Sequence, residues 1–306
     1  MPNKDFREGT EEFPPIDTLV EVLIHEVTNH FKIGNDTVLY RLMHWFMRVP
    51  SERFAALMQR FDQMVAEKSI WEAARDALPQ FTDGLNFKNN KIIPKEGPLL
   101  VVANHPGVAD FVAVMACIER KDQYILANER PMLSIMPNAS RHMLLVDVQN
   151  PHRLDIMHRV INYLHNGKTV IIFPRGNLEP DPALYSGALE SLKNWSQSIG
   201  VFLSKVPETV LQPLLISNVV APKAWRSLIS TRARSIKTRH QIAMILQAVM
   251  QRITKKGGWR IPVYVKAAPW LSAYDLAPNL DVNALNQAVM AYMGDLLKAE
   301  FPEAIS

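Results

Sequence analysis

One stretch of the sequence decides the fold: Leu99-Leu-Val-Val-Ala-Asn-His-Pro-Gly-Val-Ala-Asp-Phe-Val-Ala-Val-Met115. Its first five residues are all apolar, which is typical of a buried strand. Pro106 and Gly107 end that strand, because proline lacks the amide proton that a sheet needs and glycine tolerates unusual backbone angles. From Val108 onward the apolar residues recur at spacings of three and four, which predicts a helix. His105 is thus expected in a strand-to-helix turn, with Asp110 in the first turn of the helix.

This turn is a candidate active site, because open α/β sheets place their ligands at the carboxyl ends of strands. A carboxylate at Asp110 would accept a hydrogen bond from one ring nitrogen of His105 and leave the other nitrogen to take a proton from a hydroxyl. The spacing alone is weak evidence, since roughly one histidine in twenty has such a partner by chance. His142 and Asp147 share it, but on a predicted strand they point to opposite faces. We therefore interpret only the first pair as a site.

Four segments of the chain carry a pattern in a fixed order: Asn104-His105-x-x-x-x-Asp110, Leu164-His-Asn-Gly-Lys-Thr-Val-Ile-Ile-Phe-Pro-Arg-Gly-Asn177, Gln212-Pro213-Leu-Leu-Ile216, and Trp259-Arg-Ile-Pro-Val-Tyr-Val-Lys-Ala-Ala-Pro269. Together they resemble the glycerolipid acyltransferase family, which includes glycerol-3-phosphate and lysophosphatidate acyltransferases with a His-x4-Asp motif. The resemblance covers about residues 86–302.

The resemblance implies transfer of a fatty acyl group from a thioester to a hydroxyl, without a covalent enzyme intermediate. His105 would be the general base and Asp110 would orient it, and such a base typically contributes about 10²–10⁴-fold. Backbone donors around Gly176 would stabilise the oxyanion. The implied co-substrate is acyl-CoA or acyl-ACP, and the acceptor is of the glycerol-3-phosphate or lysophospholipid type. No cofactor is expected. A metal is not expected either, because two candidate ligands in the turn find no patterned third.

A second turn, Phe173-Pro174-Arg175-Gly176-Asn177, follows another buried strand, so both turns are expected at the same edge of the sheet. Arg175 offers a planar fork of donors to phosphate or carboxylate, and Gly176 lets the backbone approach a bound group. The alternative is an ordinary turn with a solvated arginine. The predicted substrate-binding residues are Asn104, Phe173, Pro174, Arg175, Gly176, Asn177 and Arg153.

Two blocks depart from the pattern of the family. Arg175 and Asn177 stand where the family usually has Glu and Thr, and Val148 stands where its second block usually has Arg. One hypothesis is that Arg175, aided by Arg141 or Arg153, replaces the missing phosphate contact. The other hypothesis is an acceptor that carries no phosphate.

The composition is that of a folded globular protein, with 306 residues, 48% hydrophobic and 21% charged. The single cysteine excludes an internal disulfide and fits a reducing compartment. Cys117 is interpreted as a buried structural thiol, since no base accompanies it as a nucleophile. The polar N-terminus does not resemble a signal peptide, and no apolar run approaches the roughly 20 residues that cross a bilayer. We expect a cytoplasmic protein, with peripheral membrane contact as a further expectation.

The fold class predicted is α/β, with a mostly parallel sheet flanked by helices and a small helical domain before it. Helical periodicity fills residues 16–81, with helices expected near 17–27, 36–46, 51–65 and 70–78. A further helix is expected near 186–199, between two strands of the sheet. The expected domains are therefore 1–85 and 86–306. In the first of them Trp45, Phe46 and Met47 either pack in the core or touch lipid, and core packing is the preferred interpretation.

A basic helical insertion is expected at about 221–258, between two core strands. No acidic residue occurs between Glu208 and Asp275, while that interval contains Lys223, Arg226, Arg232, Arg234, Lys237, Arg239, Arg252, Lys255, Lys256, Arg260 and Lys266. Such a segment suits an anionic membrane surface, an acyl carrier protein or the phosphates of coenzyme A. A plain solvated face is an equal alternative. Nucleic acid is not expected, because no binding module is recognisable.

Other enzyme classes lack their motifs in this sequence. There is no Gly-x-Ser-x-Gly elbow of a hydrolase, no Walker loop and no dinucleotide fingerprint. A binding or regulatory protein that keeps the fold but has lost activity is the alternative to an enzyme, suggested by the altered second and third blocks. Retention of both His105 and Asp110 favours the enzyme.

Overall fold

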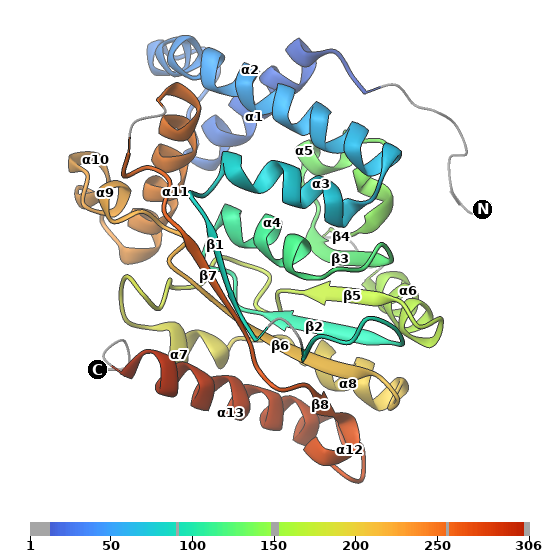
Figure 1. Cartoon of the computed structure of the whole chain (residues 1–306). Coiled ribbons are helices and arrows are strands. Elements are labelled where there is room, and N and C mark those ends of the chain that lie inside the picture. The colour runs from blue at the N-terminus through green and yellow to red at the C-terminus, as the bar shows by residue number, and fades with distance from the viewer. Residues whose placement is uncertain (1–12, 90–91, 148–152, 255–256, 303–306) are drawn as a thin grey trace.

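An eight-stranded sheet forms the centre of the computed structural model, which describes residues 13–89, 92–147, 153–254 and 257–302 (Figure 1). The strands are β1 (Leu85–Lys88), β2 (Leu99–Ala103), β3 (Gln123–Asn128), β4 (Met143–Val146), β5 (Thr169–Ile172), β6 (Val210–Ser217), β7 (Val263–Ala267) and β8 (Leu271–Ser272). Their order is β1-β7-β6-β2-β5-β3-β4, and β8 pairs with β6. Only the pairings of β7 and β8 with β6 are antiparallel. The predicted mostly parallel sheet is confirmed.

Strand β2 lies at the middle of the sheet, and all five of its residues are buried. It pairs in parallel with β5 on one side and with β6 on the other, so that Leu99 lies opposite both Thr169 and Val210. A strand covered on both faces needs apolar residues at every position, which explains its unbroken apolar run. The parallel register brings the turns that follow β2 and β5 to the same edge of the sheet.

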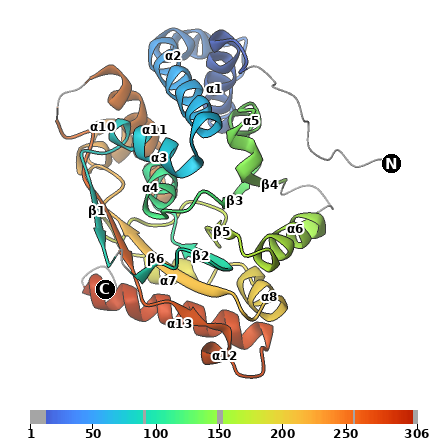
Figure 2. The same cartoon turned by 45° about the vertical axis from the view of Figure 1, so that its right-hand side comes forward.

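Helices cover both faces of this sheet (Figures 1 and 2). They are α1 (Ile16–His30), α2 (Val38–Glu67), α3 (Ile70–Ala77), α4 (Val108–Cys117), α5 (Pro131–Ser134), α6 (Arg153–His165), α7 (Ala188–Leu192), α8 (Ser198–Lys205), α9 (Pro222–Trp225), α10 (Leu228–Thr231), α11 (Ile236–Ile253), α12 (Ala273–Leu276) and α13 (Val282–Glu300). Leu99 and Val101 pack into the core formed with α1–α4, and Leu100 and Val102 pack into the core formed with α6, α8 and α13. Alternation along β2 thus builds two cores.

The N-terminal helices share their core with the sheet. Leu19 of α1 and Met58 of α2 belong to the same buried cluster as Val101 of β2. Asp62 of α2 also accepts the backbone N–H groups of Asn138 and Ala139, at 2.9 and 2.8 Å. The helical region is therefore packed as a layer on the sheet, and the predicted boundary after residue 85 falls inside β1.

Two predicted helices have different bounds in the structure. Helix α2 runs from Val38 to Glu67 through Pro50, where we expected a break before Ser51. A proline removes one intrahelical hydrogen bond, and the buried face of α2 against its neighbours keeps the helix continuous. The helix expected near 186–199 is instead two helices, α7 and α8. The chain turns between them, where Trp195 donates to Glu179 and the Ser196 N–H donates to Pro174 O.

The described part of the basic insertion folds as α9, α10 and α11, of which α11 lies beside α2 (Figure 1). The guanidinium of Arg53 in α2 donates to the carbonyl oxygen of Arg252 in α11. The ring of Phe54 also lies 5.6 Å from the guanidinium of Arg252. This helical group therefore joins the N-terminal helices to the rest of the chain. Among the described residues no helix combines the length and apolarity needed to cross a membrane.

Candidate active site

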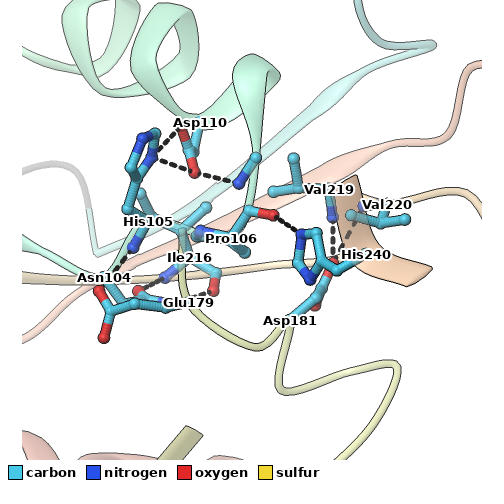
Figure 3. A network of polar contacts seen from close by, with 11 residues as sticks. Asn104, His105, Pro106, Asp110, Glu179, Asp181, Ile216, Val219, Val220 and His240 are labelled. Atoms are coloured by element: carbon cyan, nitrogen blue, oxygen red, sulfur yellow. Dashed lines mark hydrogen bonds and ion pairs between the residues drawn. The ribbon is translucent and has the colours of Figure 1, made fainter. Parts of the chain in front are cut away.

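The structure brings His105 and Asp110 together in the turn after β2. Nδ1 of His105 lies 3.1 and 3.0 Å from the two carboxylate oxygens of Asp110 (Figure 3). Asp110 is fully buried, whereas the side chain of His105 keeps 25% of its surface exposed. A carboxylate only accepts, so Nδ1 carries the proton and Nε2 of His105 is the basic nitrogen.

Gly107 holds Asp110 from the other side. Its N–H donates to Oδ2 of Asp110 at 2.6 Å and caps the start of α4. The backbone of Gly107 is extended, so its conformation does not require glycine. Its size does: a Cβ at this position would lie 2.8 Å from Cγ1 of Val219 and 3.3 Å from Sδ of Met244. Close approach to the segment after β6 and to α11 therefore selects glycine here.

Asn104 does not line the cavity beside His105. Its side-chain N–H donates to the carbonyl oxygen of Ile216, and its Oδ1 accepts the N–H of Ile216, both at 2.8 Å. The side-chain amide of Asn104 thus donates to and accepts from one residue of β6, in the way that two paired residues of neighbouring strands bond to each other. The predicted contact of Asn104 with substrate is not supported by this geometry. Asn104 instead extends the pairing of β2 with β6 up to the turn that carries His105.

Glu179 is a site residue that the sequence analysis missed. Its buried carboxylate accepts the N–H of His105 at 3.0 Å, and its own N–H donates to the carbonyl oxygen of His105 at 2.8 Å (Figure 3). The second carboxylate oxygen accepts from Ser191 at 2.8 Å and from Trp195 at 2.9 Å. The chain after β5 is thereby fixed to the backbone of His105. Only its place two residues after Asn177 could have drawn attention to it.

Two buried acids control the pKa of His105. Burial by itself would lower that pKa, but the charge and hydrogen bond of Asp110, together with the charge of Glu179, raise it overall. Burial raises the pKa of Glu179, and the donors Trp195, Ser191 and His105 oppose that rise. The arrangement thus favours the imidazolium form of His105.

His105 opens onto a cavity of about 1270 Å³. Phe173, Pro174, Arg175, Gly176 and Asn177 all line it, so the two predicted turns do meet at one site. The rest of the wall is mostly apolar and includes Phe54, Leu57, Met58, Phe61, Phe111, Met115, Met132, Met136 and Met143. The volume exceeds the range of about 300–1,000 Å³ typical of small-molecule pockets.

The cations of the cavity differ from those expected. Arg175 is half-buried and donates to Ser191 Oγ at 3.0 Å. Arg141 does not line the cavity, while Arg130 and Lys237 line it and were not anticipated. The side chain of Arg153, and Val148 in the altered second block, lie outside the described residues.

Gly176 adopts a left-handed conformation, with φ of 65°. Its N–H donates to Phe173 O at 2.9 Å and closes the turn, so this N–H does not serve as the predicted oxyanion donor. Its carbonyl oxygen accepts from the side chain of Asn128 at 2.5 Å. Gly176 therefore joins the turn after β5 to the end of β3.

The remaining candidate residues have local roles. Cys117 is buried in α4, and burial raises the pKa of its thiol far above the usual range. That environment matches the structural interpretation, because a reactive thiol needs a lowered pKa. Nδ1 of His142 donates to the carbonyl oxygen of Gln123 at 2.8 Å.

Comparison with known proteins identifies the region that carries this site. Residues 84–203 match the family model described as Acyltransferase. The matched range includes His105, Asp110 and Glu179, whereas α11 and its side chains lie beyond it. The match agrees with the family predicted from the sequence for this part of the chain.

One solved structure similar to the chain is the 1-acyl-sn-glycerophosphate (LPA) acyltransferase PlsC from Thermotoga maritima. The identity is 15% and the TM-score is 0.44, over 94% of this chain and 98% of that chain. No curated protein matches the chain.

The geometry of the pair predicts the effect of neutralising its acid. Asp110→Asn removes the charge that raises the pKa of His105, so that pKa should fall. A titration of the ring resonances of His105 by NMR measures the change. Asp147→Asn is the matched control, because Asp147 follows His142 at the same spacing, and it should leave the pKa of His105 unchanged. An unchanged pKa in Asp110→Asn would contradict the assigned pairing.

Proposed function

We propose that the acyltransferase domain moves a fatty acyl group from acyl-CoA or acyl-ACP to the hydroxyl of a glycerol-3-phosphate-type or lysophospholipid acceptor, with His105 as the general base. The observation that carries this proposal is that His105, paired with Asp110, lines a large, mostly apolar cavity. An acyl chain needs such a wall, and the attacking hydroxyl needs such a base.

In the proposed reaction Nε2 of His105 takes the proton of the acceptor hydroxyl while its oxygen attacks the thioester carbonyl carbon. The C–S bond then breaks, and the imidazolium returns the proton to the leaving thiolate. The products are an ester and a free thiol, so the protein forms no covalent bond. Asp110 keeps Nδ1 of His105 protonated and stabilises the imidazolium. Asp110 therefore orients the base without reacting.

Three cationic side chains that line the cavity, those of Arg175, Arg130 and Lys237, support an anionic acceptor. Arg175 uses one of its five N–H groups on Ser191, which leaves the guanidinium able to bind a phosphate as well. Arg130 and Lys237 are exposed and line the same cavity. We assign the phosphate contact to Arg175, with Arg130 and Lys237 in place of the Arg141 expected from the sequence.

We also propose that the start of the basic insertion contacts an anionic membrane. Leu228 and Ile229 of α10 are 76% and 60% exposed, and Arg232 and Arg234 beside them are exposed as well. Apolar side chains surrounded by cations are typical of interfacial membrane binding. Ile236 at the start of α11 is also exposed and lines the cavity, so this surface adjoins the opening of the site.

The N-terminal helices expose a second apolar surface. Trp45 and Phe46 are 75% and 52% exposed, although packing in the core was the preferred interpretation, and only Met47 is buried. They lie on one face of α2 with Val38, Leu39, Leu42 and Val49, which are exposed as well. This face supports the lipid-contact alternative for these residues.

The first test is the base itself. His105→Ala should lower thioester consumption with an acceptor hydroxyl by about 10²–10⁴-fold, because proton removal from the hydroxyl is lost. The measurement is release of free thiol over a panel of glycerol-3-phosphate, lysophosphatidate and unphosphorylated monoacylglycerol. Activity of the parent chain should fall as pH drops below the raised pKa of His105, since the protonated ring accepts no proton. A parent chain that consumes no thioester with any acceptor would favour the alternative of a binding or regulatory protein.

The role of Arg175 separates the two acceptor hypotheses. Arg175→Ala should raise KM for phosphorylated acceptors by about tenfold or more and change KM for unphosphorylated acceptors little, because a charge-assisted contact is lost only in the first case. Arg141→Ala is the control outside the cavity. Equal losses on both kinds of acceptor would exclude the phosphate role.

Sedimentation with vesicles tests the membrane surface. Binding to phosphatidylglycerol vesicles should exceed binding to phosphatidylcholine vesicles and weaken as salt rises, because the attraction is partly ionic. The double change Leu228→Ser and Ile229→Ser should weaken binding, whereas Leu154→Ser, an equally exposed leucine of α6, should not. Equal binding to both kinds of vesicle would contradict the proposal. An effect of the double change on carrier-protein binding alone would assign the surface to an acidic carrier protein instead.

A further inference from the structure

The peptide group between Pro106 and Gly107 is held from both of its sides. Its carbonyl oxygen, on Pro106, accepts from Nε2 of His240 at 2.7 Å (Figure 3). Its N–H, on Gly107, donates to Oδ2 of Asp110 at 2.6 Å. Because a peptide group is planar and rigid, the contact on the carbonyl side fixes the direction of the N–H on the other side. His240 of α11 is thus connected, through this peptide group, to the carboxylate of Asp110 that orients His105.

The contacts of His240 determine its tautomer. A carbonyl oxygen only accepts, so Nε2 carries the proton, and Nδ1 then accepts from the hydroxyl of Tyr185 at 2.5 Å. His240 is buried, and both of its ring nitrogens are used. Neither nitrogen is therefore left to act as a base or to bind a metal ion.

The hydrogen bonds of this series run in one direction as far as Asp110. Tyr185 donates to His240, His240 donates to the Pro106–Gly107 peptide, and the peptide donates to Asp110, which accepts from Nδ1 of His105. Successive hydrogen bonds polarise one another, so a donor at the carbonyl side strengthens the N–H on the other side. The stack of Tyr185 on Trp225, with centroids 4.6 Å apart, supports the outer end of this series.

The surroundings of the peptide are also fixed. Asp181 is buried and accepts the N–H groups of Val219 at 2.7 Å and of Val220 at 3.0 Å, as Figure 3 shows. The side chain of Val219 is the one that would meet a Cβ on Gly107. The segment that packs against Gly107 is thus fixed by the backbone contacts of Val219 and Val220 with Asp181. His240 is the side chain that donates to the carbonyl oxygen of Pro106.

We propose that His240 is a positioning residue for the active site: it holds the Pro106–Gly107 peptide so that the Gly107 N–H fixes Asp110, and through Asp110 the ring of His105. The proposal rests on the proposed role of His105 as the base. It gives the basic insertion a second task, because α11 lies outside the matched acyltransferase domain and yet supports the catalytic turn.

Two substitutions separate this role from simple packing. His240→Gln keeps an N–H donor at the place of Nε2, because its amide nitrogen lies the same number of bonds from Cβ. His240→Leu fills similar space without a donor. We expect kcat to fall by about tenfold in His240→Leu, with KM for the thioester within about twofold, and to recover largely in His240→Gln.

NMR supplies a readout that needs no activity. The amide proton of Gly107 and the Nδ1 proton of His105, both bonded to Asp110, should move upfield in His240→Leu and stay near their parent positions in His240→Gln. Tyr185→Phe is the milder variant if His240→Leu does not fold, and it should shift the same two protons by a smaller amount. The matched control is His142→Leu, which also removes a histidine-to-carbonyl bond but lies elsewhere.

The outcomes separate the two proposals. Unmoved proton resonances in His240→Leu, or a Gln variant as impaired as the Leu variant, would overturn the positioning role and leave His240 as a packing residue. Moved resonances in a protein whose parent form consumes no thioester would support the positioning role and overturn the proposed function instead.

Discussion

The structure of the site depends on one buried carboxylate, that of Asp110. A charge with no exposure to water is costly unless donors surround it, and here the donors are the N–H of Gly107 and Nδ1 of His105. The same two contacts begin helix α4, end the turn after β2 and orient the imidazole. Removing either donor would leave a buried charge short of a partner, so the turn, the helix and the base are linked.

Parallel pairing provides the rest of the site. Because β2 and β5 run side by side in the same direction, their following turns meet, and Glu179 after β5 bonds to the backbone of His105. Asp110 and Glu179 together raise the pKa of His105 against the opposing effect of burial. Side chains of α2, α4 and α5 contribute to the apolar wall of the cavity. The N-terminal helices also belong to the same buried core as the sheet.

The basic insertion has two distinct faces. Its inner face carries His240, which reaches the turn of His105, and Arg252, whose guanidinium lies near the rings of Phe54 and Phe81. Burial lowers the pKa of Arg252 to about 10, yet the residue stays charged at neutral pH. Its outer face exposes apolar and cationic side chains near the cavity. One segment thus carries both a surface suited to an anionic partner and a contact that supports the turn of His105.

The sequence by itself determined the β2–turn–α4 unit and the pairing of His105 with Asp110, because both follow from local geometry within a few residues. It also determined that the sheet is mostly parallel, through the alternation of apolar strands with helices. Only the tertiary structure decided the partners of that unit: Asn104 meets Ile216, His105 meets Glu179, and Pro106 meets His240, across 112, 74 and 134 residues of chain. No spacing rule reaches that far, since such contacts depend on which strands and helices become neighbours in space. The same reason explains why the sequence favoured burial for Trp45 and Phe46: their helical pattern shows an apolar face, and only the packed structure shows that nothing in the described chain covers it.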